Sequence, residues 1–425
     1  MMELHGWGRY PRIDGEMAAF EGTLGEGQGP VVARGSGRSY GDSAVGGHVL
    51  DMRGHDCMLE FDDKTGILHC QSGVLLADIV ETFVPRGWFL KVTPGTQFVT
   101  VGGAIAADVH GKNHHAAGCF STCVRALRLM LPGGRMEVVE PGSELFLATC
   151  GGMGLTGIIL DAWIELERVA SSSIDQVTIK TGNLEETLAA FEAHAAAPYS
   201  VAWVDCLARG EKLGRSLLSL GGFAKDGDLA LPRRHMVGVP VTPPALLLNR
   251  YSVAAFNTLY YAKAPQGRSR QKVGLRSFFY PLDALGDWNR LYGPQGFVQY
   301  QFVLPKKVGA AGMRAILDAI AASGEGSFLA VLKLCGKANG NYLSFPMEGY
   351  SLALDFKATP KVLALLDRLD AMVREQGGRI YLAKDARMKP DMLAGYAQVE
   401  TFRALRKKYG MDTVFASHQS QRLGL

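Results

Sequence analysis

The sequence predicts an α+β protein with two domains. The chain has 425 residues, which is more than a single hydrophobic core usually organises. Segments with the pattern of strands and segments with helical periodicity are interleaved along it. The composition changes near Glu167, and we expect the chain to cross between domains at Ser171–Ser173.

The composition is that of a globular protein, with 47% hydrophobic and 20% charged residues. A net charge of +4 gives no support for a nucleic-acid partner but is compatible with a phosphorylated substrate. We find no apolar secretion signal and no run of about 18 apolar residues that would span a membrane. Seven scattered cysteines without a CxxC motif are typical of reduced thiols. We therefore expect a cytoplasmic protein, with membrane contact that is at most peripheral.

A glycine-rich loop follows the first predicted strand. Residues 1–30 are expected to be irregular, and Pro30–Ala33 is expected to be a short buried strand. The loop Arg34–Asp42 combines glycines with two arginines, and free backbone N–H groups and guanidinium groups together favour an anion. Because the spacing is not GxGxxG, a phosphate site and a long surface turn are equally good interpretations of the loop alone.

Turn signals and periodicity define the elements that follow. Asp63–Gly66 and Pro132–Gly134 are expected to be hairpin turns, and Ser143 is expected to begin a short capped helix. The predicted helices of this half span 74–83 and 143–149, and the predicted strands span 88–92, 124–130, 136–139 and 158–166.

The stretch Thr93–His115 is the most informative part of the sequence. Its Gly-Gly pair and small residues let the backbone approach a flat or phosphorylated ligand closely. The polar cluster His110–His115 follows. A zinc site through His110 and His114 would require a helix that Gly111 opposes, and no HExxH motif supports it. A solvated polar loop is the other alternative, but the apolar run before the cluster favours a pocket wall with a reaction centre at its end.

A formal GxGxxG occurs at Gly152, Gly154 and Gly157. The dinucleotide-binding fingerprint requires a strand before the glycines and a helix after them. Here the predicted order is helix, glycines, strand. We therefore do not expect a nicotinamide site, although close packing of this backbone against a cofactor is expected. The sequence contains no GxSxG motif that would indicate a hydrolase. The isolated acids Asp108 and Asp355 are expected to be structural.

Three polar residues stand out in the second half of the chain. Gln299 and Gln301 share one face of a predicted strand, which suggests a polar ligand, although exposure to solvent would produce the same pattern. Lys384 ends an apolar strand predicted at 379–387, where it is either an exposed strand end or a pocket residue with a lowered pKa. The other predicted strands span 177–180, 200–207, 296–304, 328–334 and 350–356, and the predicted helices span 184–196, 310–323, 360–375 and 392–409.

Residues 232–271 lack strong periodicity and are expected to form a long loop. The segment includes Pro243–Pro244, the apolar run Ala245–Leu248 and a basic end. Long loops in compact domains are usually functional or disordered. An apolar loop with basic flanks could rest on an anionic membrane or cover a lipid.

Six motifs together resemble the decaprenylphosphoryl-β-D-ribose 2′-oxidase family, which belongs to the vanillyl-alcohol-oxidase superfamily of FAD proteins. They are ARGSGRSYGD, TPGTQFVTVGGAIAADVHGKNHH, CGGMGLTGII, QYQF, LKL and YLAKD, in that order along nearly the whole chain. The resemblance implies a PCMH-type FAD-binding domain built from residues 1–168 and 379–425. A substrate domain of antiparallel sheet plus helices, residues 169–378, would be inserted between them.

The resemblance also implies which residues contact the ligands. Arg38 stands where many superfamily members have a histidine that bonds covalently to the flavin, so we expect non-covalent FAD. The implied substrate residues are Lys112, Trp203, Gln299, Gln301, Lys333, Ala353 and Lys384. The implied FAD contacts are Val31, Ala33, Arg34, Gly35, Ser36, Gly37, Arg38, Ser39, Tyr40, Gly41, Gly95, Thr100, Val101, Gly102, Gly103, Ala107, Asp108, Val109, His110, Gly154, Ile159 and Tyr381. Cys335 and Ala353 depart from the best-known pattern of the family.

The implied activity is oxidation of the C2′ hydroxyl of a polyprenyl-phosphoryl ribose to the 2′-keto sugar. An NAD(P)H-dependent keto-reductase would be the partner in an epimerisation that makes an arabinose donor for the cell envelope. Lys384 is the candidate for polarising or deprotonating the hydroxyl, and His110 would border flavin and substrate. Two alternatives are an FAD oxidase of a soluble sugar, alditol or aldonolactone, and a non-catalytic protein that binds lipid-linked sugars.

Overall fold

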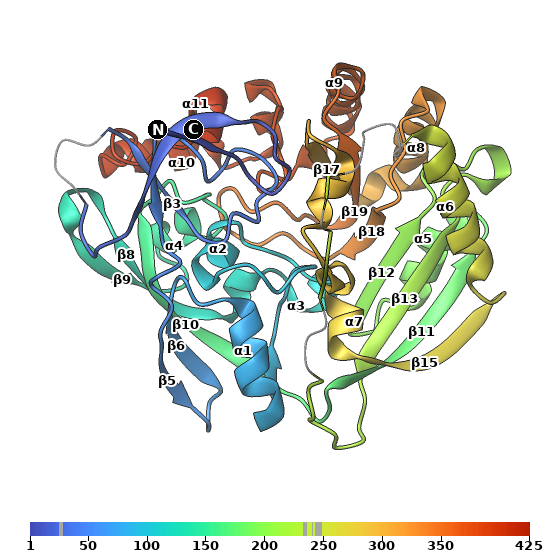
Figure 1. The fold of residues 1–425 in the computed structure, drawn as a ribbon, viewed down its shortest axis with the longest axis horizontal. Coiled ribbons are helices and arrows are strands. Elements are labelled where there is room, and N and C mark those ends of the chain that lie inside the picture. The colour runs from blue at the N-terminus through green and yellow to red at the C-terminus, as the bar shows by residue number, and fades with distance from the viewer. Residues whose placement is uncertain (25–28, 233–235, 240, 243–248) are drawn as a thin grey trace.

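Four sheets organise the described part of the computed structural model, which covers residues 1–24, 29–232, 236–239, 241–242 and 249–425 (Figure 1). The first sheet has the order β1-β2-β4-β3, with β2 and β3 both parallel to β4. Its strands are β1 (Met2–Leu4), β2 (Ile13–Ala19), β3 (Val31–Arg34) and β4 (His48–Asp51). The N-terminal residues predicted to be irregular therefore supply two strands; that prediction was wrong.

The second sheet is antiparallel, with the order β5-β6-β10-β8-β9 and β7 paired to the end of β10. Helix α1 covers it with a fully apolar face, because Leu76, Ile79, Val80 and Phe83 recur at helical spacing and are all buried. The strands are β5 (Met58–Asp62), β6 (Ile67–Gln71), β7 (Trp88–Leu90), β8 (Val124–Met130), β9 (Met136–Val139) and β10 (Ile158–Arg168). The helices are α1 (Leu76–Phe83), α2 (Val101–Ala106), α3 (His114–Ala117) and α4 (Glu144–Thr149), with short 3-10 turns η1 (Val84–Arg86), η2 (Phe120–Cys123) and η3 (Pro132–Gly134).

The third sheet has eight strands in the order β15-β11-β13-β12-β18-β19-β17-β20, all antiparallel. Helix α8 contacts both α5 and α9, and all three contact the sheet, so they cover one face of it. The strands are β11 (Ser173–Thr181), β12 (Tyr199–Val204), β13 (Ser216–Phe223), β15 (Arg268–Gly274), β17 (Phe297–Pro305), β18 (Ala330–Cys335), β19 (Gly349–Lys357) and β20 (Arg379–Ile380). The helices are α5 (Leu184–Ala193), α8 (Gly309–Ser323) and α9 (Pro360–Glu375).

The remaining elements surround these sheets. Two-residue strands β14 (Val237–Gly238) and β16 (Leu285–Gly286) pair in parallel. The remaining helices are α6 (Arg250–Lys263), α7 (Leu275–Phe279), α10 (Val399–Lys408) and α11 (His418–Leu423), and the remaining 3-10 turns are η4 (Gly210–Lys212), η6 (Pro281–Ala284), η7 (Trp288–Tyr292), η8 (Lys306–Val308) and η9 (Pro390–Gly395). No described helix is long and apolar enough to cross a bilayer.

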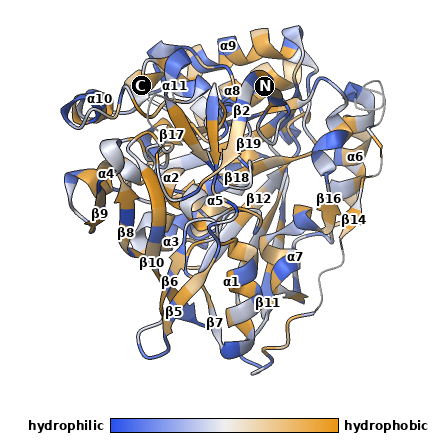
Figure 2. Ribbon diagram, turned by 60° about the vertical axis from the view of Figure 1, so that its left-hand side comes forward, coloured by the Kyte–Doolittle hydropathy of each residue, from blue (hydrophilic) through white to orange (hydrophobic). Residues whose placement is uncertain are grey.

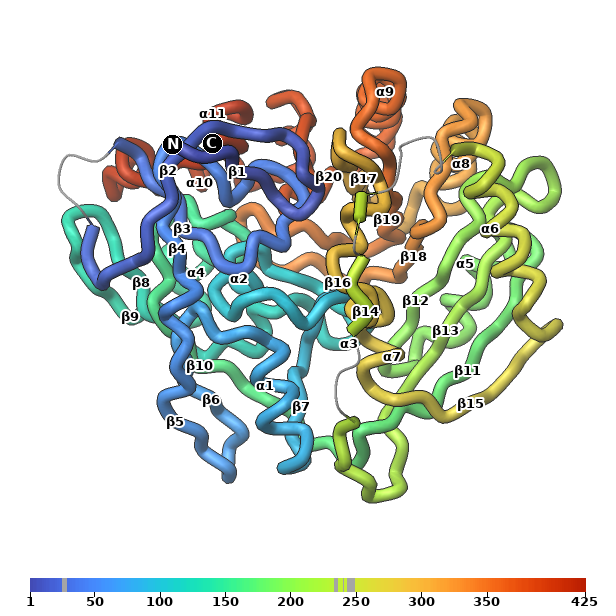
Figure 3. The backbone as a smooth tube through the Cα atoms, in the orientation of Figure 1, coloured from blue at the N-terminus to red at the C-terminus, as the bar shows by residue number. Residues whose placement is uncertain are grey.

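The end of the chain returns to its beginning. Phe415 forms a parallel bridge with Val31, and α11 lies beside the first sheet, so the two termini are neighbours (Figure 3). Apolar residues line β10 and β17 inside the molecule, whereas α10 is largely hydrophilic (Figure 2). The main hydrophobic cluster runs continuously through elements of the second and third sheets. The prediction of an α+β fold is confirmed; the boundaries proposed at residues 168 and 378 stay a prediction.

Most predicted elements are present within a few residues, but three are not. The strand predicted at 379–387 ends after β20, because Lys384 N and Asp385 N both bond to Tyr381 O and close a turn. The helix predicted at 392–409 begins only at Val399, after the turn η9. The loop predicted at 232–271 contains helix α6, which begins in a capping box at Asn249, and strand β15. The predicted Pro243–Pro244 and Ala245–Leu248 portion lies outside the described residues.

Candidate active site

A cavity of about 730 Å³ lies between the glycine-rich loops and the open face of the eight-stranded sheet. Ligand pockets commonly have volumes of this order. The sheet contributes alternate residues, as strand geometry requires, because successive side chains point to opposite faces. These are Gln176 and Thr178, Val201 and Trp203, Leu217 and Ser219, Gln299 and Gln301, Val331 and Lys333, and Ser351 and Ala353. The predicted common face of Gln299 and Gln301 is confirmed.

The loop 34–40 lines the opposite wall and is built to receive an anion. No described residue accepts a backbone hydrogen bond from the N–H groups of Ser36, Gly37, Arg38 or Ser39. Such free donors facing a cavity favour negative charge. At Gly35, a Cβ atom would lie 2.2 Å from Oγ1 of Thr100, so only glycine fits between the loop and that residue.

The two arginines of this loop, Arg34 and Arg38, make different contacts. Arg34 donates to the backbone carbonyls of His5 (2.8 Å) and Ala44 (3.2 Å), so it holds the loop in place. The guanidinium of Arg38 lies over the ring of Trp7, 3.9 Å from its centroid. Burial lowers the pKa of both arginines. Arg38 therefore forms part of the cavity wall as a stacked cation.

Helix α2 continues this wall, and sequence analysis missed it as a helix. Thr100 caps it by accepting a hydrogen bond from Gly103 N (3.2 Å), and Gly102 and Gly103 line the cavity. A threonine cap followed by an apolar run was the signal for this helix. Its two glycines concealed that signal, because glycine is a poor helix former.

His110 is a neutral side chain held by the substrate-side sheet. Nε2 of Gln301 donates to Nε2 of His110 at 3.0 Å, which places the proton of the imidazole on Nδ1. Burial, with the nearby positive charge of Lys333, holds the pKa of His110 well below its ordinary value. Nδ1 is buried and has no hydrogen-bond partner among the described residues. The ring therefore presents one unsatisfied donor within the cavity wall.

Three lysines converge on the same cavity: Lys112, Lys333 and Lys384. Burial lowers the pKa of each, to about 7 for Lys112 and Lys384. Lys112 donates to the carbonyl of Phe278. An anion that binds among lysines whose pKa values are lowered stabilises their charged forms.

Lys384 has the environment of a base. Its Nζ atom lies 3.7 Å from the centroid of the Tyr40 ring. Burial lowers its pKa most, Asp355 acts against that shift, and Lys333 adds to it. Asp355 accepts a hydrogen bond from Nε2 of Gln299 at 2.5 Å, and burial raises the pKa of its carboxyl group. Lys384 therefore reaches its neutral form near neutral pH while facing the cavity.

The cavity gathers most of the predicted ligand residues. All seven predicted substrate residues line it. The predicted FAD contacts that line it are Ala33, Arg34, Gly35, Ser36, Gly37, Arg38, Ser39, Tyr40, Gly95, Thr100, Gly102, Gly103, Ala107, Val109, His110, Gly154, Ile159 and Tyr381. Further residues that line it and that the sequence did not indicate include Trp7, Ser72, Phe256, Tyr260, Phe278 and Ser351.

Four predicted FAD contacts do not line the cavity. Val31 and Val101 are buried in the hydrophobic core. Gly41 packs against the turn after Lys384, where a Cβ would lie 1.8 Å from Asp385 O. The carboxylate of Asp108 accepts hydrogen bonds from Ser121 N, Asn339, Asn341 and Ser344, so it fixes the loop 339–344. Its structural role was one of the sequence-based expectations.

The sequence analysis considered two other ligand sites, a zinc site and a nicotinamide site. Among the described residues, no group of three His, Cys, Asp or Glu side chains could hold a metal ion. The glycines at 151–157 lie between α4 and β10, so the predicted order of helix, glycines and strand is confirmed.

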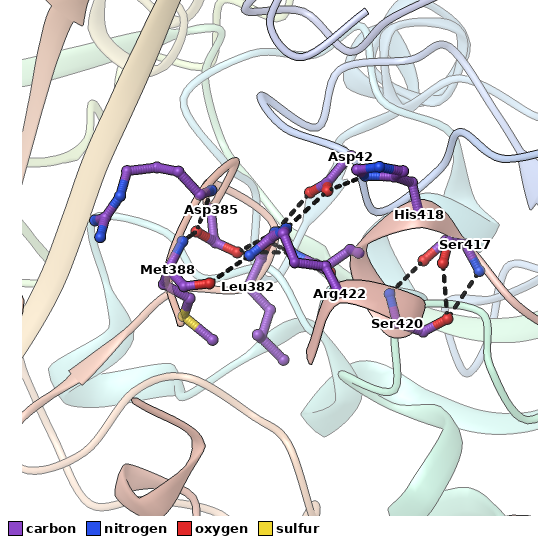
Figure 4. Close-up of polar contacts among 10 residues, drawn as sticks. Asp42, Leu382, Asp385, Met388, Ser417, His418, Ser420 and Arg422 are labelled. Carbon is purple, nitrogen blue, oxygen red and sulfur yellow. Dashed lines mark hydrogen bonds and ion pairs between the residues drawn. The ribbon is translucent and has the colours of Figure 1, made fainter. Parts of the chain in front are cut away.

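A polar clamp from the C-terminal helix joins the glycine-rich loop to the Lys384 turn (Figure 4). Arg422 donates to Asp42 at 2.9 Å and to Asp385 at 2.7 Å. His418 approaches Asp42 at 2.7 Å. Burial acts to raise the pKa of Asp42, but the hydrogen bonds from His418 and Arg422 outweigh it and hold the pKa below its usual value. Asp42 ends the loop and Asp385 follows Lys384, so Arg422 positions both walls.

We expect Arg422→Ala to lower the free energy of unfolding by about 3–5 kcal/mol, because it removes the ion-pair partner of buried Asp385 and leaves buried Asp42 with His418 alone. Arg314→Ala is the matched control: its exposed pair with Glu185 contributes below about 1 kcal/mol. Unfolding in urea measures the free energy of unfolding of both variants. The contribution of Asp42 is present above its unfolded pKa and is lost as the pH falls through its lowered folded pKa. Equal free energies of unfolding for the two variants at neutral pH would contradict the stabilising role of the polar clamp.

Comparisons with known proteins agree with this geometry. The model of the FAD binding domain matches residues 13–140. A decaprenylphosphoryl-beta-D-ribose oxidase of Mycolicibacterium smegmatis is 39% identical over 426 residues, covering 96% of this chain and 91% of the relative. An uncharacterized Streptomyces coelicolor protein, from the mprA 5′ region, is 34% identical over 83% of this chain and its own whole length. A D-lactate dehydrogenase of Anaerostipes hadrus is 28% identical over 45% of this chain and 42% of its own.

The residues present fit FAD. At Gly95 and Gly154, both in the cavity wall, an added Cβ would meet no atom within 4 Å, so the missing side chains leave room for a ligand. The free N–H groups at 36–39 suit a pyrophosphate. The unsatisfied Nδ1 donor of His110 suits a polar acceptor on the ligand. The chain is an FAD-dependent oxidoreductase.

Proposed function

The chain belongs to the decaprenylphosphoryl-β-D-ribose oxidase family, and from this we propose that it oxidises the C2′ hydroxyl of a polyprenyl-phosphoryl-β-D-ribose to the 2′-keto sugar. The observation that carries the proposal is the arrangement of the cavity. Lys112, Lys333 and Lys384 and the amides of Gln299 and Gln301 line it together with the glycine-rich loop. This set suits a hydroxylated sugar bearing a phosphodiester.

The proposed mechanism divides the work between cofactor and chain. When bound, FAD supplies the chemistry that accepts the hydride from C2′. Lys384 takes the proton of the C2′ hydroxyl, which its lowered pKa permits near neutral pH. Gln301 orients the neutral ring of His110 at the boundary between cofactor and sugar. Lys112 and Lys333 place their amines beside the phosphate, whose negative charge favours the protonated form of both.

We propose non-covalent FAD. By the family resemblance, Arg38 stands where many superfamily members have a flavin-linking histidine. Its guanidinium, stacked on Trp7, is not a nucleophile at ordinary pH. Acid precipitation of the purified protein is expected to leave all the yellow colour in the supernatant. Colour retained in the washed pellet would contradict this proposal.

A test with substrates separates this function from its alternatives. Anaerobic addition of farnesylphosphoryl-β-D-ribose is expected to bleach the flavin absorbance, and free ribose, alditols and aldonolactones at the same concentration are expected to leave it unchanged. Bleaching by the soluble compounds alone would assign the enzyme to a soluble-sugar oxidase. A yellow protein that none of these compounds bleaches would support a binding protein instead.

The proposed product requires a second enzyme. A 2′-keto sugar becomes the 2′-epimer only by reduction from the opposite face, so the partner is a keto-reductase that draws hydride from NAD(P)H. This pair of reactions would complete the epimerisation to an arabinose donor for the cell envelope.

We also propose peripheral contact with an anionic membrane on the cytoplasmic side. The described cysteines are all unpaired, which supports a reducing compartment. Val237 (68% exposed), Val241 (69%) and Leu259 (70%) are apolar, and the exposed strand β15 adds Arg268 and Arg270. Exposed apolar residues favour contact with the lipid interface, and exposed basic residues favour anionic headgroups.

Vesicle sedimentation tests this contact. We expect the protein to pellet with phosphatidylglycerol vesicles at low salt, and Arg268→Ala with Arg270→Ala to weaken this several-fold, since each basic residue near the surface contributes about 1 kcal/mol. Arg125→Ala with Arg135→Ala, two exposed arginines at the second sheet, is the control pair. Equal sedimentation of both double variants would contradict the contact.

A further inference from the structure

A row of aromatic side chains leads from the substrate side of the cavity to the surface of helix α6. The ring centroids of Trp203 and Tyr260 are 4.8 Å apart, those of Tyr260 and Phe256 are 5.7 Å apart, and those of Phe256 and Phe328 are 5.8 Å apart. All four line the cavity. We define them as the aromatic lane.

The lane is partly open to solvent. Phe256 is 44% exposed and Tyr260 is 45% exposed, although both also line the cavity. The indole N–H of Trp203 is already used, because it donates to Phe328 O at 3.0 Å. The lane therefore offers ring faces rather than charges or free indole donors. Such a surface suits an apolar chain and offers no charge to a phosphate.

The helix that carries the lane is fixed to the sheet beneath it. The buried side chain of Asn257 donates to Asp205 at 3.0 Å, and Tyr261 OH donates to Thr181 O at 3.0 Å. A capping box at Asn249 begins the helix. The lane is therefore a preformed surface, which lowers the entropic cost of binding.

We propose that the aromatic lane binds the prenyl chain of the substrate, with Phe256 and Tyr260 contacting isoprene units beyond the first, and guides the chain out of the cavity. This rests on the proposed function, since it assigns a place to the apolar part of the same substrate. The argument is continuity: Trp203 lies in the same sheet face as Gln299, Gln301 and Lys333, so a chain attached to a phosphate held there begins beside the lane. The branched, unsaturated units of a prenyl chain pack well on ring faces.

The test measures binding of farnesyl phosphate to the flavin-loaded protein by calorimetry, which does not depend on turnover. The variant is Phe256→Ala with Tyr260→Ala. Tyr251→Ala is the matched control: Tyr251 is 72% exposed and precedes Tyr260 by nine residues, which is about two and a half turns, so it lies on the opposite side of α6. Isopentenyl phosphate, with one isoprene unit, is the short probe.

We expect the parent and Tyr251→Ala to bind farnesyl phosphate more tightly than isopentenyl phosphate. The double variant is expected to lose about tenfold or more in affinity for farnesyl phosphate and to bind the short probe as the parent does. Equal losses of affinity for both probes, or no loss of affinity for either, would overturn the proposal. Loss of vesicle sedimentation with unchanged farnesyl phosphate binding would assign these residues to the membrane surface and also overturn it. Failure of the parent to oxidise a ribose would not alter the calorimetric result, so the two proposals fail separately.

Discussion

Replacing Lys384 by methionine is expected to slow flavin reduction by substrate by about 10²–10⁴-fold, the usual contribution of a positioned base. Methionine keeps the length of the side chain and its contact with the ring of Tyr40 but removes the group that takes the proton. FAD content and thermal stability are expected to stay close to those of the parent, because the backbone hydrogen bond of Lys384 is kept and its Nζ atom forms no hydrogen bond with a described residue. Stopped-flow absorbance under anaerobic conditions measures the rate.

The pH dependence gives the same prediction a second readout. Lys384 must be neutral to accept a proton, and burial lowers its pKa to about 7. The parent rate is therefore expected to rise as the pH increases through about 7 and then to level, and the residual rate of Lys384→Met is expected to lose this step. Lys389→Met, at an exposed lysine of the same segment, is the control and is expected to behave as the parent. A parent-like rate in Lys384→Met would contradict the assignment.

Replacing Gly41 by alanine is expected to lower the free energy of unfolding by about 3 kcal/mol or more and to reduce FAD affinity. The added Cβ would lie 1.8 Å from Asp385 O, where only backbone can move aside. The displacement separates the glycine-rich loop from the Lys384 turn, which Tyr40 N joins through its hydrogen bond to Ala383 O (3.1 Å). Both walls of the cavity are therefore affected by one methyl group.

Gly47→Ala is the matched control for this substitution. A Cβ at Gly47 would meet no atom within 4 Å, and the position lies in the same segment, immediately before β4. Thermal unfolding and titration of the apoprotein with FAD compare the two variants. If Gly41→Ala bound FAD and unfolded as Gly47→Ala does, the close packing of loop and turn would be wrong.

Sequence periodicity was sufficient to predict the elements whose structure is determined by their own residues. Helix α9 lies at the predicted residues 360–375, because a threonine cap, a proline at the first turn and an apolar face agree there. The alternation of Gln299 and Gln301 placed both amides in the cavity wall for the same reason. Helix α6 was missed because its apolar residues point partly to solvent and into the cavity, so no apolar stripe is visible in the sequence.

The base candidate shows where sequence reasoning stops. The residues around Lys384 look like an apolar strand, but they form a buried turn, because Asp385 accepts hydrogen bonds from Arg387 N and Met388 N and from Arg422. The partner Arg422 is distant in sequence, so local periodicity could not indicate it. The approach of Lys384 to Tyr40 and Asp355 likewise depends on three separate segments.

The central claim is that the C2′ hydrogen of a prenyl-phosphoryl ribose leaves as hydride. Anaerobic stopped-flow reduction with farnesylphosphoryl-β-D-ribose carrying deuterium at C2′ tests it most directly, with the C1′- and C3′-deuterated sugars as controls. We predict that flavin reduction slows several-fold with the C2′ label alone and that the product is the 2′-keto sugar. Equal rates for all labelled sugars together with a different product, or slowing by another label, would contradict the account.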